Sequence, residues 1–356
     1  MVYLLGKHNP FFGGFDMVQI ITVAKSTKDF TRKSEGDVIE LTDGRLFLAY
    51  MEFSGDGSDY ATTRIVRKIS SDRGLTWQDH QILAQTLPGD VNVYSPNLIR
   101  SKDGGILLFF MRQHTTKPRT TTMIAYKSID EGNTFFLYSE FAKNMEYSLC
   151  NAVVKRLRSG RLLLPQSPNA QGTVLYSDDD GLTWQESINR VSLPMRGAME
   201  PHVEQTRDGR GLMVLRNQLG SLFVSESTDE GVSWSKPQTT GLRTPESCPE
   251  LTRIPGTDDL LMIWNNSPYD PSFISHYGKR SPLTAAISKD NGRTWECVKD
   301  IETDPDKAFS NPGCRFVSDD KAVINYWTCE YLPTWRMQDV IDLRVALIPK
   351  KWFYEK

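Results

Sequence analysis

The 356-residue sequence contains two acidic side chains and several arginines that could form a site for an acidic ligand. Glu200 and His202 are two residues apart in a predicted strand, so their side chains lie on the same face of it. Arg216 follows Glu200 by sixteen residues and leaves the next strand of the same hairpin, where the two can meet. A guanidinium pairs with a carboxylate through two parallel hydrogen bonds. Carboxylates beside such an arginine can supply the acid/base chemistry of glycoside cleavage.

Further candidates lie in predicted loops. Asp59, with Asp56 as its alternative, lies in a segment rich in Gly and Asp at residues 54–60. Three more arginines lie at or within other long loops: Arg112, Arg280 and Arg336. Together with Glu200 and Arg216, these side chains could bind and act on a ligand that carries a carboxylate.

Every candidate also has a structural explanation that the sequence leaves open. Glu200 and Arg216 could form a salt bridge that holds no ligand, because a buried carboxylate needs a partner. His202 could be a hydrogen-bonded core residue. The loop aspartates and arginines could be solvated surface residues that pair weakly or not at all.

The elements that position these residues are marked by a repeated motif, Ser-x-Asp-x-Gly-x-Thr-Trp, which tolerates Phe135 for Trp and Ser233 for Thr. Its copies begin at Ser70, Ser128, Ser177, Ser227 and Ser288. A period near fifty residues is typical of an array of equivalent supersecondary units. The Asp and Ser can hydrogen-bond amides within a turn, and the Gly can adopt a left-handed conformation. Because five copies cannot all line one site, we interpret the motif as structural.

A hairpin signal alternates with this motif. Alternating apolar runs joined by Asp-Gly are the strongest short-range hairpin pattern. The six predicted hairpins span 38–50, 98–110, 153–164, 203–215, 251–264 and 316–327. Each unit is therefore four antiparallel strands, and the chain is predicted to be all-β, a six-bladed β-propeller forming one domain over residues 1–356. Its last blade would be closed by Asp339–Ile348 and the N-terminal Met17–Val23.

The repeat also predicts where a site lies. In each unit the Asp-Gly turn and the motif turn lie at the same end. The opposite end is therefore built from the starts of the first strands and from the loops between the second and third strands. First strands crowd the axis of a propeller, so we expect a central pocket at that end. The loops of blades one, two, five and six are long, which suits a blind pocket for a small ligand or a chain terminus.

Composition argues against several classes of function. The net charge of -2, from 42 basic and 44 acidic residues, gives no footprint for nucleic acid. No apolar run reaches the roughly 18 residues of a membrane span, and the N-terminus lacks a signal peptide, so the chain is predicted to be cytoplasmic without a membrane partner. The five cysteines show no metal-ligand spacing and no nucleotide-binding loop occurs, which predicts free thiols and no metal or cofactor. The oligomeric state is not readable from the sequence.

The five motifs are Asp-boxes (BNR repeats), and with the six hairpins the whole chain resembles the sialidase (neuraminidase) superfamily. Met199-Glu200-Pro201 and Leu215-Arg216-Asn217 match the Glu and Arg of that family's fourth blade. The resemblance implies that Asp59 and Glu200 form the acid/base pair. It also implies that Arg216 and Arg280, with Arg112 and His202, contact the substrate. A glycan or oligosaccharide is the implied partner.

Two positions depart from the family pattern. Where family sialidases begin the first inner strand with an Arg-Ile-Pro-like motif, this chain has Ser34-Glu35-Gly36. Where they place a Tyr nucleophile activated by the Glu, this chain has Phe309 to Asn311. Tyr269, Tyr277 or Tyr331 could reach in from loops.

The sequence therefore predicts a sialidase-like glycoside hydrolase that acts in exo fashion on a terminal, acidic sugar of a glycan. One alternative is a non-catalytic carbohydrate-binding propeller. Another is a different glycosidase or a uronate lyase on the same scaffold.

Overall fold

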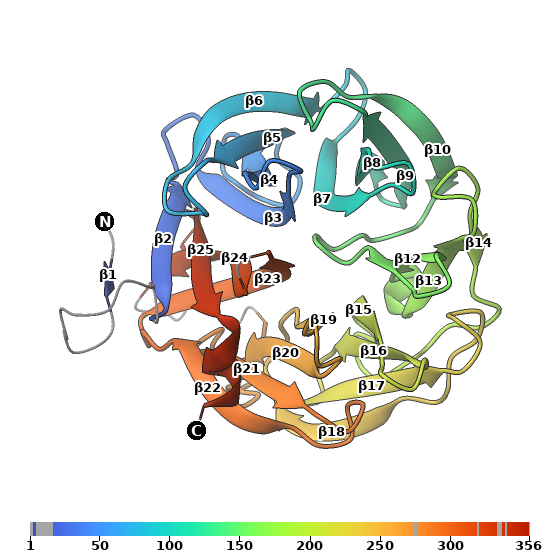
Figure 1. The fold of residues 1–356 in the computed structure, drawn as a ribbon, viewed down its shortest axis with the longest axis vertical. Coiled ribbons are helices and arrows are strands. Elements are labelled where there is room, and N and C mark those ends of the chain that lie inside the picture. Colours follow the sequence, from blue (N-terminus) through green and yellow to red (C-terminus); the bar gives the residue numbers. More distant parts are fainter. Residues whose placement is uncertain are drawn as a thin grey trace.

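The protein is a ring of six antiparallel sheets around a central axis (Figure 1). The computed structural model describes residues 3–4, 17–273, 276–318, 320–332, 337–338 and 340–355. Each of the first five sheets has four strands in sequential order, and the sixth takes strands from both ends of the chain. The predicted all-β, six-bladed propeller is thereby confirmed.

The blades follow the chain around the ring. Blade one consists of β3 (Arg32–Glu40), β4 (Leu46–Phe53), β5 (Thr63–Ser70) and β6 (Gln78–Gln85). Blade two consists of β7 (Asn92–Arg100), β8 (Ile106–Thr116), β9 (Arg119–Ser128) and β10 (Phe136–Met145). Blade three consists of β11 (Lys155–Arg156), β12 (Leu162–Gln166), β13 (Thr173–Ser177) and β14 (Gln185–Glu186).

The second half of the ring repeats this order. Blade four consists of β15 (Met199–Gln205), β16 (Gly211–Arg216), β17 (Ser221–Ser227) and β18 (Gln238–Arg243). Blade five consists of β19 (Glu250–Arg253), β20 (Leu260–Asn265), β21 (Leu283–Ser288) and β22 (Glu296–Glu302). Blade six consists of β23 (Lys307–Val317), β24 (Lys321–Glu330), β25 (Asp342–Pro349), β2 (Gln19–Ala24) and β1 (Tyr3–Leu4).

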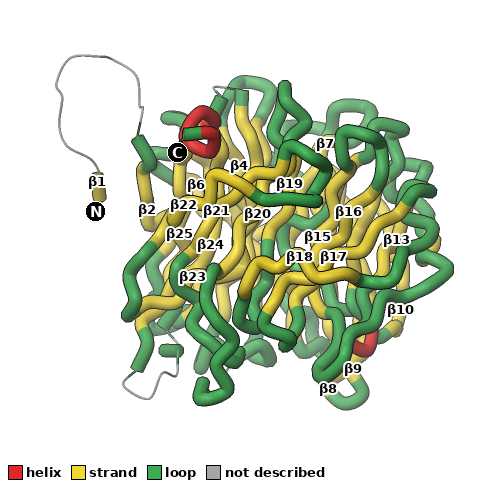
Figure 2. The backbone as a smooth tube through the Cα atoms, turned by 90° about the horizontal axis from the view of Figure 1, so that it is seen from below, coloured by secondary structure: helices red, strands yellow, loops and turns green. Residues whose placement is uncertain are grey.

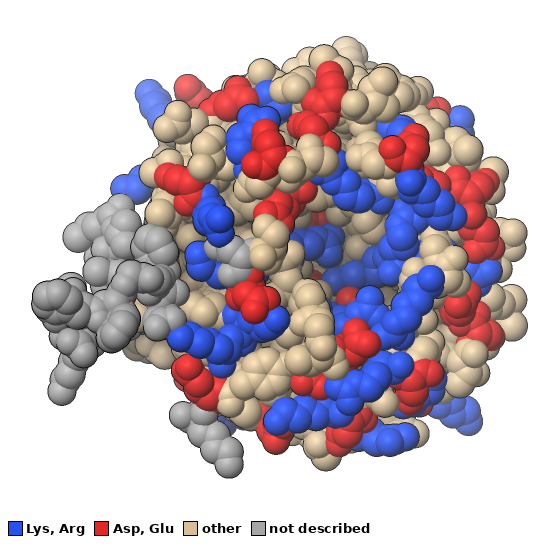
Figure 3. All heavy atoms as spheres, in the orientation of Figure 1, with Lys and Arg blue, Asp and Glu red and all other residues tan. Residues whose placement is uncertain are grey.

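The described part of the chain holds only two short 3-10 helices, η1 (Pro168–Ala170) and η2 (Lys350–Tyr354). No helix in these ranges has the length and apolar character needed to cross a bilayer. Charges of both signs are interspersed over the face shown in Figure 3, around a hollow at the axis.

The core lies between the blades. All eight residues of β4 are buried, whereas most of β6 on the rim is exposed. Six hydrophobic clusters each join two neighbouring blades, as Phe47 of blade one and Phe110 of blade two do. Strands buried on both faces explain the near-continuous apolar runs at the second strand of each hairpin.

The Asp-box turns hold neighbouring blades together. In the first copy the amide of Gly74 donates to Ser70 Oγ at 2.7 Å, and the amide of Thr76 donates to Asp72 Oδ1 at 2.8 Å. The other four copies repeat both bonds. In the second, third and fifth copies the residue after the motif's Asp reaches the Asp-Gly turn of the preceding blade, as where the Thr42 amide donates to Glu131 Oε2 at 2.9 Å. The two kinds of turn therefore share one end of the ring, and the loops between second and third strands lie at the other (Figure 2).

Candidate active site

A cavity of about 590 Å³ lies on the axis, at the end opposite the Asp-boxes. Its walls come from the segments that begin the inner strands and from the loops between second and third strands. Four of the residues predicted from the sequence line it together: Asp59, Glu200, Arg216 and Arg280. Blade one, which carries Asp59, lies across the axis from blade four, which carries Glu200 and Arg216 (Figure 1).

A β-bulge at the start of several inner strands directs side chains into this cavity. The register of the first hairpin pair shifts between Met199 and His202 in β15, and equivalent shifts occur in β3, β7 and β23. The bulged residues Glu35, Ser95, Glu200 and Asn311 all have positive φ, between 42° and 56°. For non-glycine residues this conformation is strained, and within a strand it persists only where the surrounding structure holds it. Glu35, Glu200 and Asn311 line the cavity from these equivalent positions.

Glu200 and Arg216 form an ion pair on the wall of blade four. Arg216 Nη1 donates to Glu200 Oε2 at 2.6 Å, and its Nη2 donates to Glu246 Oε1 at 3.0 Å. Met199 pairs with Arg216 in the sheet, which explains why residues sixteen apart meet. Burial would raise the pKa of Glu200, but Arg216 outweighs it and lowers that pKa below its ordinary value. Glu200 is therefore a carboxylate at neutral pH.

Arg280 is a buried cation without a carboxylate partner. Its exposed fraction is 3%, and no acidic group of the described residues lies within ion-pair distance of it. Its Nη2 donates to the Glu246 carbonyl at 3.2 Å, its guanidinium lies 5.6 Å from the centre of the Trp327 ring, and its Nε has no hydrogen-bond partner. Burial, followed by the neighbouring charge of Arg216, lowers the pKa of Arg280 to about 10. The site thus holds a positive charge that an anion would balance.

Asp59 belongs to a second network, built around Arg32. Arg32 Nη1 donates to Asp59 Oδ1 at 2.7 Å and its Nη2 donates to Glu35 Oε1 at 2.6 Å. The Tyr94 hydroxyl donates to Asp59 Oδ1 at 3.0 Å. The Asp59 side chain is 68% exposed at the edge of the cavity, and the Arg32 guanidinium and the Tyr94 hydroxyl lower its pKa. For Glu35 burial prevails and raises the pKa, despite Arg32 and the Ser34 hydroxyl that donates to it.

The comparisons with known proteins identify the family. The BNR repeat-like domain matches residues 44–322, well over half of the chain. The chain belongs to this BNR repeat-like family. No curated protein matches its sequence.

Solved structures with the same fold include sialidases. A protein of unknown function from Dyadobacter fermentans is 18% identical, with a TM-score of 0.69 over 92% of this chain and 98% of that one. The NanB sialidase of Streptococcus pneumoniae is 15% identical, with a TM-score of 0.71 over 93% of this chain and 70% of that one. The Trypanosoma rangeli sialidase is 15% identical, with a TM-score of 0.69 over 94% of this chain and 60% of that one. At these identities the likeness shows that this BNR repeat-like chain has the sialidase-like fold.

Other predicted residues of the BNR repeat-like chain lie elsewhere. Arg112 does not line the cavity, because its Nε donates to Asp90 Oδ2 at 2.8 Å on the side of blade two. Asp56 is exposed and accepts a hydrogen bond from the Ser58 amide at 3.0 Å, so Asp59 is the loop aspartate that reaches the cavity. Arg336 lies outside the described residues. His202 is fully buried beneath the cavity, with Glu250 as its partner at 2.8 Å.

Of the residues Phe309 to Asn311, where the sequence departs from the family pattern, Asn311 is the one that lines the cavity. Its Oδ1 accepts a hydrogen bond from Trp327 Nε1 at 3.1 Å, and both residues line the cavity. None of the loop tyrosines proposed as replacements, Tyr269, Tyr277 and Tyr331, is among the cavity-lining residues that the structure describes. The tyrosines that do line it are Tyr60, Tyr94 and Tyr147.

Several cavity residues were missed by the reasoning from sequence. Arg32 lies two residues before the position at which the family pattern places an arginine. Arg119 lies within the predicted long loop of blade two but was not singled out, and Arg196 lies just before the start of β15. Glu35 was noted only as a departure, although it occupies the same bulge position as Glu200. The sequence does carry a signal for the bulge. The bulged residue is followed by a proline in three blades, at Ser95, Glu200 and Asn311, and by a glycine after Glu35.

Proposed function

We propose that the protein is a glycoside hydrolase that removes a terminal, acidic sugar from a glycan. The carboxylate of that sugar would bind between Arg280 and Arg216. Asp59 and Glu200, on opposite sides of the cavity, would carry out acid/base chemistry on the glycosidic bond.

The observation that supports this most strongly is the uncompensated charge of Arg280. A buried guanidinium without a carboxylate is unfavourable, since charges that leave water need a partner. Arg32 and Arg216 have carboxylate partners within the protein, whereas Arg280 has none among the described residues. A bound carboxylate would supply the missing partner through paired, charge-assisted hydrogen bonds.

The protonation states suit proton transfer. Asp59 and Glu200 have lowered pKa values, so both are ionised at neutral pH and can accept a proton. The pKa of Glu35 is raised by burial, so Glu35 would donate the proton to the leaving oxygen, while Asp59 and Glu200 would act as the bases. Groups whose environments push their pKa values apart are typical of paired acid/base roles.

A substrate array tests the proposal. The wild-type protein is incubated with aryl glycosides that include a sialoside, uronides and neutral hexosides, and release of the aglycone is measured. We expect turnover of an acidic glycoside. Asp59→Asn and Glu200→Gln should lower kcat by about 10²- to 10⁴-fold while the Kd for the acidic sugar changes little. Asp56→Asn is the matched control, since Asp56 lies in the same loop outside the cavity, and its activity should stay near that of the wild type.

The same experiment separates the alternatives. The absence of a tyrosine from Phe309 to Asn311 favours a carbohydrate-binding propeller without catalysis as the second candidate. In that case calorimetry would detect binding of an acidic sugar that depends on Arg280, with every glycoside intact. A uronate lyase would release a product with a new double bond that absorbs in the ultraviolet. Either outcome would refute the hydrolase proposal.

A further inference from the structure

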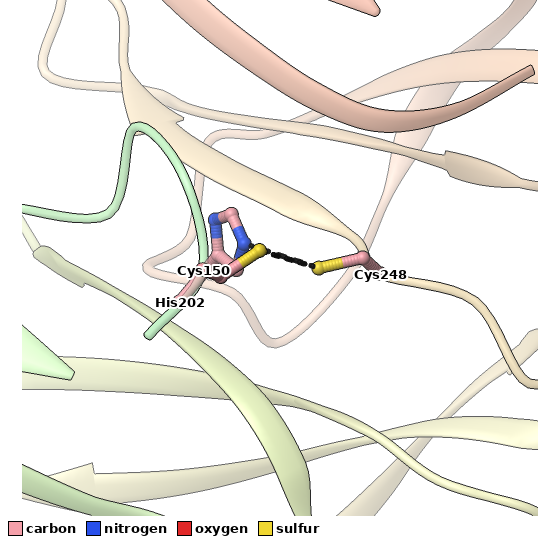
Figure 4. A group of neighbouring side chains, drawn as sticks. All are labelled: Cys150, His202 and Cys248. Atoms are coloured by element: carbon pink, nitrogen blue, oxygen red, sulfur yellow. Dashed lines mark hydrogen bonds between the residues drawn. The ribbon is translucent and has the colours of Figure 1, made fainter. Parts of the chain in front are cut away.

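Three side chains with metal-binding atoms meet beneath the cavity floor. Sγ of Cys150, Sγ of Cys248 and a ring nitrogen of His202 all lie within 4.8 Å of one another (Figure 4). They come from three successive blades: Cys150 precedes β11, His202 lies in β15 and Cys248 precedes β19. Their exposed fractions are 5%, 0% and 1%. The closed ring of the propeller therefore brings together a buried Cys2His cluster, which could not be predicted from the spacing of these residues in the sequence.

The histidine is held in the form that a metal requires. His202 Nδ1 lies 2.8 Å from Glu250 Oε2, so the carboxylate fixes the proton on Nδ1 and leaves the Nε2 lone pair facing the sulfurs. Lys155 Nζ, 3.3 Å from Glu250 Oε1, balances that carboxylate. A carboxylate that accepts from the remote nitrogen of a histidine is the usual outer partner of a zinc-ligating imidazole.

The sulfur–nitrogen distance matches a tetrahedral zinc site, the two sulfurs would move apart by about 0.7 Å to share an ion, and they are too far apart for a disulfide. Cys248 Sγ lies 3.5 Å from His202 Nε2, and the two sulfurs are 3.1 Å apart. With zinc bonds of about 2.3 Å to sulfur and 2.0–2.1 Å to nitrogen, a tetrahedral site places sulfur and nitrogen about 3.5 Å apart and two sulfurs about 3.8 Å apart. A disulfide would need the sulfurs at about 2.05 Å. A disulfide would also remove the Cys248 thiol, which can donate a hydrogen bond to the buried His202 Nε2.

The cluster adjoins the cavity wall. His202 follows Glu200 by two residues in β15, and Glu200 lines the cavity.

We propose that Cys150, His202 and Cys248 bind one zinc ion, with the fourth coordination position on the side of Glu200 and the cavity. Two thiolates and a neutral imidazole balance the charge of Zn²⁺, and binding releases the two thiol protons to solvent. The ion would cross-link blades three, four and five at the axis. This site is independent of the proposed glycosidase activity.

The test uses the full, tag-free chain, purified under reducing conditions and dialysed after exposure to zinc chloride. Metal analysis should find one zinc ion per chain, and zinc should raise the Tm because it binds the folded state. Cobalt(II) in place of zinc should give the thiolate charge-transfer band and the strong visible absorption of a tetrahedral site. Cys150→Ser and Cys248→Ser should each lose both signals. Cys297→Ser, which changes a cysteine outside the cluster, should keep them.

Glu250→Gln provides a second variant that keeps all three ligands. Loss of the outer carboxylate should weaken zinc affinity by about 10- to 100-fold, as measured by competition with a chelator. The proposal is overturned if the folded wild-type chain retains no zinc, or if Cys150→Ser and Cys248→Ser bind it as the wild type does. It is equally overturned if thiol titration finds a Cys150–Cys248 disulfide and the reduced chain still binds no zinc.

Discussion

At the level of single residues, the two cavity arginines of blades four and five differ in what balances their charge. Arg216 lies between the carboxylates of Glu200 and Glu246, at 2.6 Å and 3.0 Å. Arg280 has only a carbonyl and an aromatic ring as its neighbours in hydrogen-bond and cation–π contacts. The ion pairs of Arg216 stabilise the folded protein, whereas the proposed function assigns the charge of Arg280 to a ligand. Loss of Arg216 should therefore lower the free energy of unfolding, whereas loss of Arg280 should abolish ligand binding without lowering it.

This contrast predicts opposite effects of two equivalent substitutions. Arg280→Met removes an uncompensated buried charge, so the free energy of unfolding should stay the same or rise by about 1 kcal/mol while binding of acidic sugars is lost. Arg216→Met leaves the Glu200 carboxylate without its ion-pair partner, while Glu246 keeps Arg196 at 2.5 Å, and should lower the free energy of unfolding by about 3 kcal/mol. Urea unfolding at pH 7 measures both. A loss above about 2 kcal/mol in Arg280→Met would show that Arg280 is a structural residue.

Sequence reasoning located part of this site for a physical reason. Glu200 and Arg216 were found because strand pairing places the ends of one hairpin together, and the structure pairs Met199 with Arg216. Arg32 and Glu35 were not found, because a bulge with positive φ reverses which residue of the segment faces the cavity. Arg112 was misplaced since the position of its guanidinium depends on Asp90, which lies in a different loop. The alternation of side chains along a regular strand predicts neither the bulge nor the position of the Arg112 guanidinium.

At the level of elements, the Asp-boxes work as clasps between blades. Arg100 of β7 forms a bidentate pair with Glu131, with bonds of 2.6 Å and 2.8 Å, and the Thr42 amide of blade one donates to the same carboxylate. Asp180 repeats the arrangement in the next motif, with Arg156 and the Lys102 amide. The sequence predicted a structural motif from its repetition. It did not reveal that the residue after the motif's Asp bonds to the preceding blade.

Glu131→Gln should therefore weaken the contact between blades one and two. These charge-assisted bonds lower the pKa of Glu131 from 4.5 to about 2, chiefly through Arg100. A lowered pKa adds stability that is present above about pH 4.5 and is lost as the pH falls towards 2. At pH 7 we expect the variant to lose about 1–2 kcal/mol in urea unfolding, and the difference from wild type should shrink between pH 4.5 and 3.

Glu230→Gln is the control for that prediction. It changes the same position of the fourth motif, where no ion pair links the carboxylate to a described residue. Its effect should stay within about 0.5 kcal/mol. An unchanged difference between wild type and Glu131→Gln from pH 7 to pH 3 would contradict the assigned role.

At the level of the whole molecule, ring closure decides what the sequence can and cannot reveal. The repeat predicts six blades and a last blade built from both termini, and β2 does pair with β25 in the sixth sheet. Closure also brings together residues that no repeat unit links, such as Cys150 and Cys248, which are 98 residues apart. The five cysteines were interpreted as free thiols because their spacing carried no ligand pattern. Which inner-strand residues meet at the axis depends on the closed ring, so it cannot be predicted from any one segment of the sequence.

Because β2 closes the sixth sheet, we expect Ile21 of this strand to contribute to the stability of the whole propeller. Ile21 pairs with Val345 of β25 and belongs to the cluster between blades six and one, with an exposed fraction of 7%. Ile21→Ala should lower the free energy of unfolding by about 2–4 kcal/mol, because it removes buried methyl groups and leaves a cavity. Thr22→Ala, the next residue and only partly buried, should lose less than about 1 kcal/mol. Because β2 also covers the edge of β25, hydrogen exchange in residues 342–349 should accelerate in Ile21→Ala and not in Thr22→Ala. If that exchange is unchanged in a destabilised Ile21→Ala, the N-terminal strand does not hold the ring closed.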